Sequence, residues 1–145
     1  MTGDRDWSNV ELLNSTLDLL HILYRIDILI EGEARGADKL SRIHGEKLGI
    51  KVLRYYADWR NLGLKAGVIR NTRMLEEGRP DFAVAFHHDL SKSRGTKDMV
   101  LKCIYANIKV LHILSENERR LYDINRMVGD VQVQICSEQA ANYKI

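Results

Sequence analysis

Cysteine, net charge and long apolar runs are all scarce in this chain of 145 residues. The two cysteines, Cys103 and Cys136, lack the spacing of a metal-binding pair, so we expect free thiols in a reducing compartment rather than a disulfide or a nucleophile. A formal charge of +2 is too small to indicate nucleic-acid binding by itself. No apolar stretch approaches the roughly 20 residues that cross a membrane, and no signal segment opens the chain. We therefore expect a cytoplasmic protein without a membrane partner.

The chain does contain a regular alternation of apolar segments and helical segments. Strands are predicted at 27–32, 50–56, 81–86 and 108–114, and helices after Ser8 and at 34–49, 66–77 and 95–107. The strands are continuous apolar runs, as expected where both faces of a sheet are covered. The pattern predicts an α/β domain with a parallel sheet and helices on both faces. Only two residues precede Gly3, so the first strand is nearly absent or the true start lies upstream.

The loops after the carboxyl ends of parallel strands build the binding site of such a sheet. Here they hold glycines that let backbone approach a ligand, arginines that can bind phosphate, and tryptophans that can stack on a base or cover the edge of the core. Helix amino ends near Gly36, Gly67 and Gly95 offer N–H donors to an anion. The candidate ligand-binding residues are Gly3, Asp4, Arg5, Trp7, Gly32, Arg35, Gly36, Asp38, Asp58, Trp59, Arg70, Asn71, Arg94, Gly95 and Thr96.

Several of these residues have a purely structural alternative. Thr96 could cap the helix that follows it, Arg70 could form a surface salt bridge, and Asp4 could hydrogen-bond within its own turn. The adjacent His87 and His88 point apart in an extended loop, and no third ligand lies at a recognisable spacing. We predict no metal site and no cofactor.

Six segments together resemble the SLOG superfamily, and specifically its YspA/cpYpsA-related branch. They are "GDRDW", "EGEARGADKL", "ADW", "AGVIRNTRML", "DFAVAF" and "SRGTKDMV", in matching order from Thr2 to about Ile113. The resemblance implies a Rossmann-like three-layer sandwich that binds a nucleotide or a nucleotide-derived ligand resembling NAD or ADP-ribose. This branch is frequent in phage genomes, so a phage origin, with the host cytoplasm as location, is also implied.

Related LOG-type phosphoribohydrolases carry a Gly-Gly-x-Gly-Thr-x-x-Glu motif whose glutamate works with an arginine of the preceding helix. Arg70 matches that arginine, but Ser93 and Arg94 replace the first glycines and Met99 occupies the glutamate position. Asp98 lies one residue early, about 100° around the helix. No catalytic residue is therefore assigned.

Two functions of different classes follow from these observations. The first is a sensor or sequestering protein that binds a nucleotide-derived small molecule. The alternative is a LOG-like nucleotide phosphoribohydrolase or N-glycosidase with a non-standard carboxylate supplied by Asp4, Asp6, Glu31, Asp38 or Asp58. A DNA-binding role, known in a DprA relative within the wider superfamily, is disfavoured by the small charge and the absence of a basic run.

The tail lies outside the resemblance. Residues 1–114 form the predicted SLOG-like domain, and residues 115–145 form an extension. Its segment "SENERRLYDINRMV" predicts an amphipathic helix and "VQVQI" predicts a strand. We expect this extension to pack on the same domain or on a partner subunit, and the protein to form a homo-oligomer.

Overall fold

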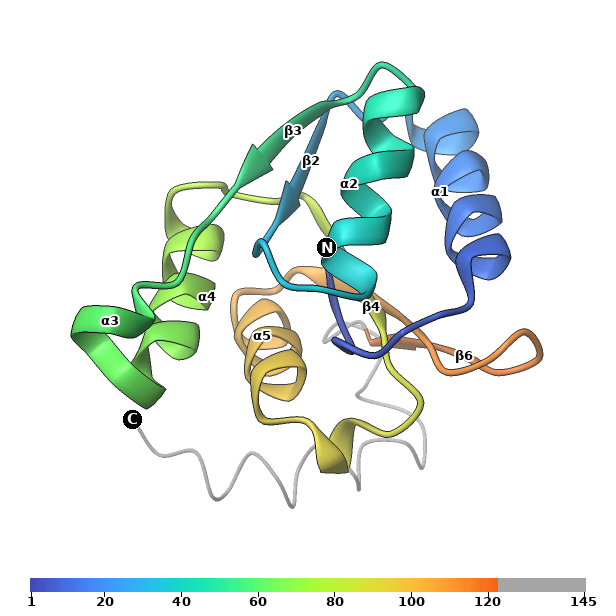
Figure 1. Cartoon of the computed structure of the whole chain (residues 1–145). Helices are drawn as coiled ribbons and strands as arrows, with labels where there is room; N and C mark the ends of the chain where they lie inside the picture. The colour runs from blue at the N-terminus through green and yellow to red at the C-terminus, as the bar shows by residue number, and fades with distance from the viewer. Residues whose placement is uncertain (123–145) are drawn as a thin grey trace.

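Strands and helices alternate along residues 1–122, the part of the chain that the computed structural model describes (Figure 1). This alternation confirms the α/β class, and short 3₁₀ turns at 63–65 and 90–92 interrupt it. The elements are β1 (Thr2–Gly3), α1 (Val10–Tyr24), β2 (Ile28–Glu31), α2 (Ala37–Lys47), β3 (Lys51–Arg54), α3 (Trp59–Leu62), α4 (Ala66–Glu76), β4 (Phe82–Phe86), α5 (Arg94–Tyr105), β5 (Lys109–Ile113) and β6 (Arg119–Tyr122).

The sheet is mostly parallel. Strands β1, β4 and β5 pair side by side in parallel, and β2 pairs with β3 in parallel. The amino nitrogen of Met1 donates to the carbonyl of Ile30 at 2.6 Å and so connects the β2–β3 pair to the edge of β1. Although β1 has only two residues, it pairs with Ala85 and Phe86 at the carboxyl end of β4. The loops that follow the parallel strands therefore meet at one edge.

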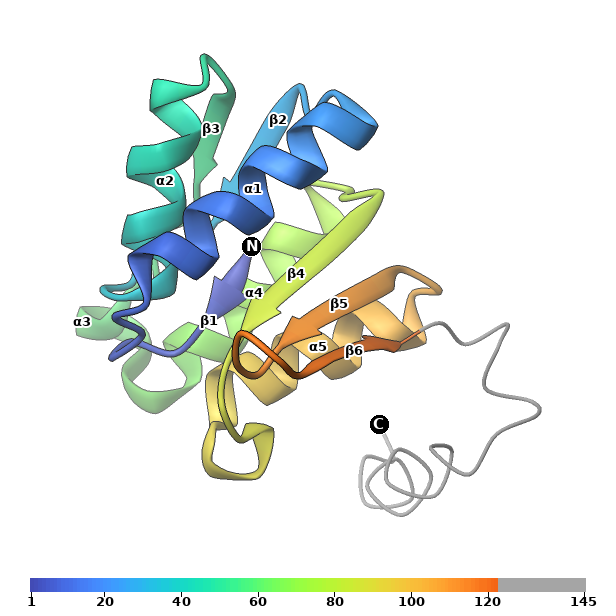
Figure 2. The ribbon, with the colours of Figure 1, turned by 90° about the vertical axis from the view of Figure 1, so that its right-hand side faces the viewer.

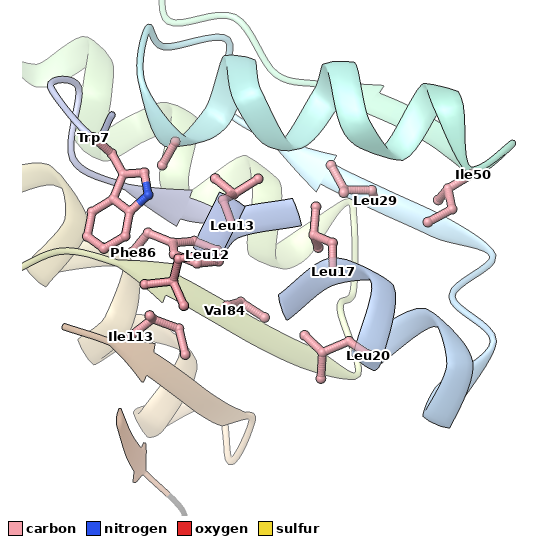
Figure 3. Packing of buried hydrophobic residues seen from close by; sticks show 11 residues of the cluster. Trp7, Leu12, Leu13, Leu17, Leu20, Leu29, Ile50, Val84, Phe86 and Ile113 are labelled. Carbon is pink, nitrogen blue, oxygen red and sulfur yellow. The ribbon is translucent and has the colours of Figure 1, made fainter. Parts of the chain in front are cut away.

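Helices cover both faces of the sheet, as the three-layer prediction requires (Figure 2). On one face, Leu13 and Leu17 of α1 pack with Val84 and Phe86 of β4 and with the ring of Trp7 (Figure 3). These β4 side chains point to that face because alternate residues of a strand point to opposite sides.

The second face is covered by α4 and α5. The intervening β4 residues, Ala83 and Ala85, pack there with Met74 of α4 and with Met99 and Cys103 of α5. Both cores draw on the same short strands, which is why these strands are apolar throughout.

The helix predicted to begin at Ser115 is not present at that point. Residues 119–122 instead form β6, which pairs antiparallel with β5, with Ile113 opposite Arg119. A tight turn precedes it, in which the backbone N–H groups of Leu114 and Ser115 donate to the Glu118 carbonyl. Pairing with β6 satisfies backbone groups that β5 would otherwise expose at the sheet edge. The predicted strand "VQVQI" lies outside the described residues.

Within residues 1–122, no helix combines the length and apolar character needed to span a bilayer.

Candidate functional site

The loops after β1, β2 and β3 surround a cleft at the carboxyl edge of the sheet, and α4 closes one side. The cleft has a volume of about 540 Å³. Its lining combines three arginines, two aromatic rings and small residues, as a site for a planar anionic molecule requires. The lining residues are Arg5, Gly32, Glu33, Ala34, Arg35, Tyr56, Ala57, Trp59 and Arg70.

One wall of the cleft is formed by Trp59, the first residue of α3. Its ring is half exposed, and the Arg5 guanidinium lies 5.4 Å from the ring centroid. The outer edge of its six-membered ring lies beside α4, where a Cβ on Gly67 would stand 3.2 Å from the indole. The backbone thus holds an aromatic surface and a cation next to each other at the mouth of the cleft.

Arg70 reaches the cleft from the second turn of α4, but its guanidinium is engaged with the protein. It donates to the carbonyl of Gly32 and, at 3.0 Å, to the side-chain oxygen of Asn71. The Asp38 carboxylate lies 4.0 Å away. A Cβ at Gly32 would overlap the guanidinium, so the glycine is what allows Arg70 to cross the loop. Burial lowers the pKa of Arg70, and the nearby Asp38 opposes that shift.

The buried carboxylate of Asp38 organises the loop after β2. Its Oδ2 accepts from the backbone N–H groups of Gly32 at 3.1 Å and Ala34 at 3.4 Å. Its Oδ1 has no hydrogen-bond partner among the described residues, and burial raises the pKa of this carboxyl. Asp38 is buried and is not among the residues that line the cleft, and it holds the loop from beneath.

Two further acidic residues hold the same loop from the other side. Glu33, with a positive φ of 53°, receives two hydrogen bonds from Arg54 at 2.6 and 2.7 Å and another from Arg42. These bonds lower the pKa of Glu33 to about 2. Glu31 is fully buried, and burial raises its pKa to about 7. Its Oε2 accepts from the Glu33 N–H at 2.6 Å.

Two glycines bring β1 and α2 into close contact at the centre of the edge. A Cβ on Gly3 would meet the side chain of Ala37 and the carbonyl of Phe86. Gly36 has a φ of +69°, and a Cβ there would overlap the backbone of Asp4 and Arg5. Both glycines allow two backbone segments to lie close together, and neither glycine lines the cleft.

The amino end of α5 lies beside β1 rather than in the cleft. Ser93 caps this helix by accepting from the Thr96 N–H at 3.1 Å, so Thr96 is not the cap. The Thr96 hydroxyl donates instead to the Gly3 carbonyl at 3.0 Å. Gly95 faces open space and Arg94 is exposed.

Asn71 links α4 to this part of α5. Its side-chain nitrogen donates to the Gly95 carbonyl at 3.0 Å and to Asp98 at 2.9 Å. Asp98 also receives a hydrogen bond from Lys102. Met99, at the position of the LOG glutamate, is buried in the core under β4. Neither position offers a free carboxylate to the cleft.

Two predicted site residues have structural roles. Trp7 is only 3% exposed, stacks on His88 at 4.7 Å and lies in the α1-side core, so it is not available to a base. It is buried because its turn folds back over Phe86. The Asp58 carboxylate caps α3 by accepting from the backbone and side chain of Asn61.

The histidine loop after β4 is held by backbone groups. Nδ1 of His87 accepts from the Asp89 N–H at 3.0 Å, and its Nε2 lies 3.9 Å from Asp4. Burial lowers the pKa of His87, which favours its neutral form. The other oxygen of Asp4 accepts from the Asp6 N–H within its own turn. Over residues 1–122, no three His, Cys, Asp or Glu side chains come together to hold a metal ion.

The structure brings five of the predicted residues into the cleft: Arg5, Gly32, Arg35, Trp59 and Arg70. The sequence prediction missed Glu33, Ala34, Tyr56 and Ala57, which also line it. All four follow the carboxyl ends of β2 and β3, so strand position alone could have indicated them. Nothing in the local sequence indicates the ion pairs of Arg42 and Arg54, because these depend on contacts between elements.

Comparison with known proteins gives two matches. A family model described as "YspA, cpYpsA-related SLOG family" matches residues 1–62, which include β1, β2, β3 and much of the cleft. The gene 61 protein of Mycobacterium phage D29 is 30% identical over 118 residues, which cover 77% of this chain and 92% of the relative. No solved structure matches the chain.

Proposed function

The chain belongs to the YspA, cpYpsA-related SLOG family, and we propose that it binds a nucleotide-derived small molecule in the cleft at the carboxyl edge of its sheet. The ligand class is an adenine or nicotinamide nucleotide such as NAD or ADP-ribose. The protein acts as a sensor or a sequestering protein. A phage origin and a location in the host cytoplasm are part of the proposal, and the similarity to a phage protein supports them.

The pairing of Arg5 with Trp59 is the observation that carries this proposal. The indole offers a face on which a base can stack, and Arg5 lies 5.4 Å from its centroid with an exposed side chain. Arg35 stands on the neighbouring loop, is also exposed and pairs with Asp6 at 2.9 Å. Two exposed cations beside an aromatic surface suit a ligand with a planar base and one or more phosphates.

Arg70 has a different role in this proposal. Because its guanidinium is bound to Gly32 and Asn71, it supports the loop that forms the floor of the cleft. It also adds positive charge beneath the ligand, which favours an anion. Contacts to the phosphates are assigned to Arg5 and Arg35.

The positions and contacts of the carboxylates favour binding without hydrolysis. Asp98 is bound by Asn71 and Lys102, Met99 is in the core, and Asp58 caps a helix. Glu31 and Asp38 are buried beneath the loop. Asp4 bonds within its own turn, and Asp6 pairs with Arg35. Glu33 lines the cleft, but its carboxylate is held by Arg42 and Arg54. A glycosidase needs a carboxylate that is available to the sugar, and these contacts disfavour each candidate.

Calorimetric titration with ADP-ribose, NAD and AMP tests the proposal. The wild-type chain is expected to bind one of them, and Trp59→Ala and Arg5→Gln are expected to weaken binding about five- to thirtyfold, since each removes about 1–2 kcal/mol of stacking or charge contact. Tyr105→Ala and Arg119→Gln are matched controls, because both residues are exposed and lie outside the cleft.

The ligand recovered from the titrated sample separates the two functional classes. Chromatography is expected to return it intact, whereas release of free base or of nicotinamide would establish the hydrolase alternative. Binding that is unchanged in both cleft variants would show that the ligand site lies elsewhere.

A further inference from the structure

The cleft contains a second aromatic ring, for which the proposed function gives no role. Tyr56 lines the cleft from the loop after β3 and is 58% exposed. Trp59 follows three residues later as the first residue of α3, to which the chain runs directly from β3 (Figure 1). One short segment therefore brings two aromatic side chains to the same cleft.

The alternation of side chains along β3 explains why Tyr56 reaches the cleft and the adjacent Tyr55 does not. Tyr55 packs against the core beneath α4 and α5, and the Arg73 guanidinium lies 5.7 Å from its ring centroid. The Tyr55 N–H donates to the Glu31 carbonyl at 2.9 Å, which continues the pairing of β2 with β3. Because successive residues of an extended chain point to opposite sides, Tyr56 points away from that core.

A cation that is itself fixed holds the ring of Tyr56. The Arg54 guanidinium lies 5.5 Å from the ring centroid, and Glu33 accepts two hydrogen bonds from Arg54 at 2.6 and 2.7 Å. The Trp59 ring has a corresponding cation in Arg5, at 5.4 Å. Two ring–arginine pairs thus border the cleft, one supported from β3 and one from the loop after β1. Rings held in this way lose little conformational freedom when a ligand binds.

The remainder of the lining suits a chain of atoms that joins two bases. Gly32, Ala34 and Ala57 have small side chains, which leaves room in the cleft. Arg35 contributes an exposed guanidinium that can bind phosphate. The volume of about 540 Å³ is within the usual range for pockets that enclose a small molecule. A dinucleotide has a flat base at each end and two phosphates between them, so its parts correspond to the rings and arginines of the cleft.

We infer that the ligand of the cleft is a dinucleotide, with one base on Trp59 and the second ring on Tyr56. This inference rests on the proposed function, which assigns the first base and the phosphates. Tyr56 is then a specificity-determining residue, because it favours a ligand with two rings over one that ends in a bare sugar. A ligand with a single base gains no stacking free energy at Tyr56.

Calorimetric titration with NADH and ADP-ribose isolates the second ring. The two molecules share adenine, two riboses and two phosphates and carry the same charge, and NADH adds a neutral dihydronicotinamide ring. The wild-type chain is expected to bind NADH about tenfold more tightly than ADP-ribose, as one stacked ring provides. In Tyr56→Leu the two affinities are expected to differ by no more than about twofold, and binding of ADP-ribose is expected to be unchanged.

Two further variants and one control separate stacking from changes in the shape of the cleft. Tyr56→Phe keeps the ring and is expected to keep the preference for NADH. Trp59→Ala is expected to weaken both ligands by a similar factor, because both carry adenine. Tyr105→Leu is the matched control, since Tyr105 is 52% exposed and lies outside the cleft.

The possible failures distinguish this inference from the proposed function. Equal affinity of the wild-type chain for NADH and ADP-ribose overturns the inference and leaves the proposed function standing. A preference for NADH that survives in Tyr56→Leu does the same. Equal weakening of both ligands in Tyr56→Leu also overturns it, since Tyr56 would then only support the cleft. Absence of binding by NADH, ADP-ribose and AMP overturns the proposed function and the inference together.

Discussion

At the scale of single residues, the cleft depends on groups that hold its loops in place. Gly32 has no side chain, and this lets the Arg70 guanidinium lie across the loop and hydrogen-bond to its carbonyl. Asp38 then binds the N–H groups of the same loop from below. The family motif "EGEARGAD" thus encodes the support of the loop as much as its binding surface.

Glu31 should make the stability of the protein depend on pH near neutrality. Its pKa is about 7 in the folded protein and 4.5 as an ordinary side chain, so the folded state holds the proton more tightly than the unfolded state does. Stability from this group is present below pH 4.5 and is lost as the pH rises through 7. Between pH 5 and 8, the free energy of unfolding should fall by roughly 2 kcal/mol relative to that of Glu31→Gln.

Urea denaturation at several pH values between 5 and 8 measures this difference. The matched control is Glu46→Gln, which makes the same chemical change at an exposed position of α2. Parallel pH profiles for wild type and Glu31→Gln would contradict the raised pKa of Glu31.

At the scale of elements, the junction of α4 and α5 rests on Asn71. This buried side chain contacts Arg70, Gly95 and Asp98 at once. Asn71→Ala should lower the free energy of unfolding by about 2–3 kcal/mol, since it removes the donor to Oδ2 of the buried Asp98 and to the Gly95 carbonyl, while Lys102 still binds Asp98 Oδ1. Chemical denaturation measures the loss.

The neighbouring Thr72 provides the control for Asn71. Its hydroxyl bonds only to the Val68 carbonyl on the exposed side of the same helix, so Thr72→Ala should change stability by at most about 0.5 kcal/mol. Similar losses in the two variants would show that Asn71 contributes only helix propensity.

Strand β6 shows how an element can differ from its local sequence signal. Residues 115–128 have helical apolar spacing, which favoured a helix. Yet Leu121, placed on the apolar side of that helix, is 47% exposed in β6. The segment pairs with the edge of β5 through backbone hydrogen bonds. The spacing of apolar side chains in the sequence does not indicate such pairing.

At the scale of the whole molecule, the cleft is built by loops that come from three separate strands and by α4. A nucleotide that binds there should therefore stabilise the whole fold. At about 100 times its dissociation constant, the nucleotide should raise the free energy of unfolding by about 2.7 kcal/mol. Urea denaturation with and without the nucleotide measures the gain, and an unchanged midpoint would contradict binding to the folded chain.

The sequence by itself determined the α/β class, the family and the edge of the sheet where the cleft lies. These follow from local periodicity and from the residues after each strand, which act over a few positions of the chain. The same reasoning predicted Arg5, Arg35 and Trp59 as candidates, and all three line the cleft. Their contact with a ligand remains a prediction.

Only the tertiary structure decided which way the remaining side chains face. Trp7 turns into the core, Arg70 binds a carbonyl 38 residues away, and Asp38 lies beneath the loop. Burial and hydrogen-bond partners are set by elements that meet only when the sheet assembles. For that reason the sequence could indicate the edge that carries the cleft but could not separate the residues that support the cleft from those that line it.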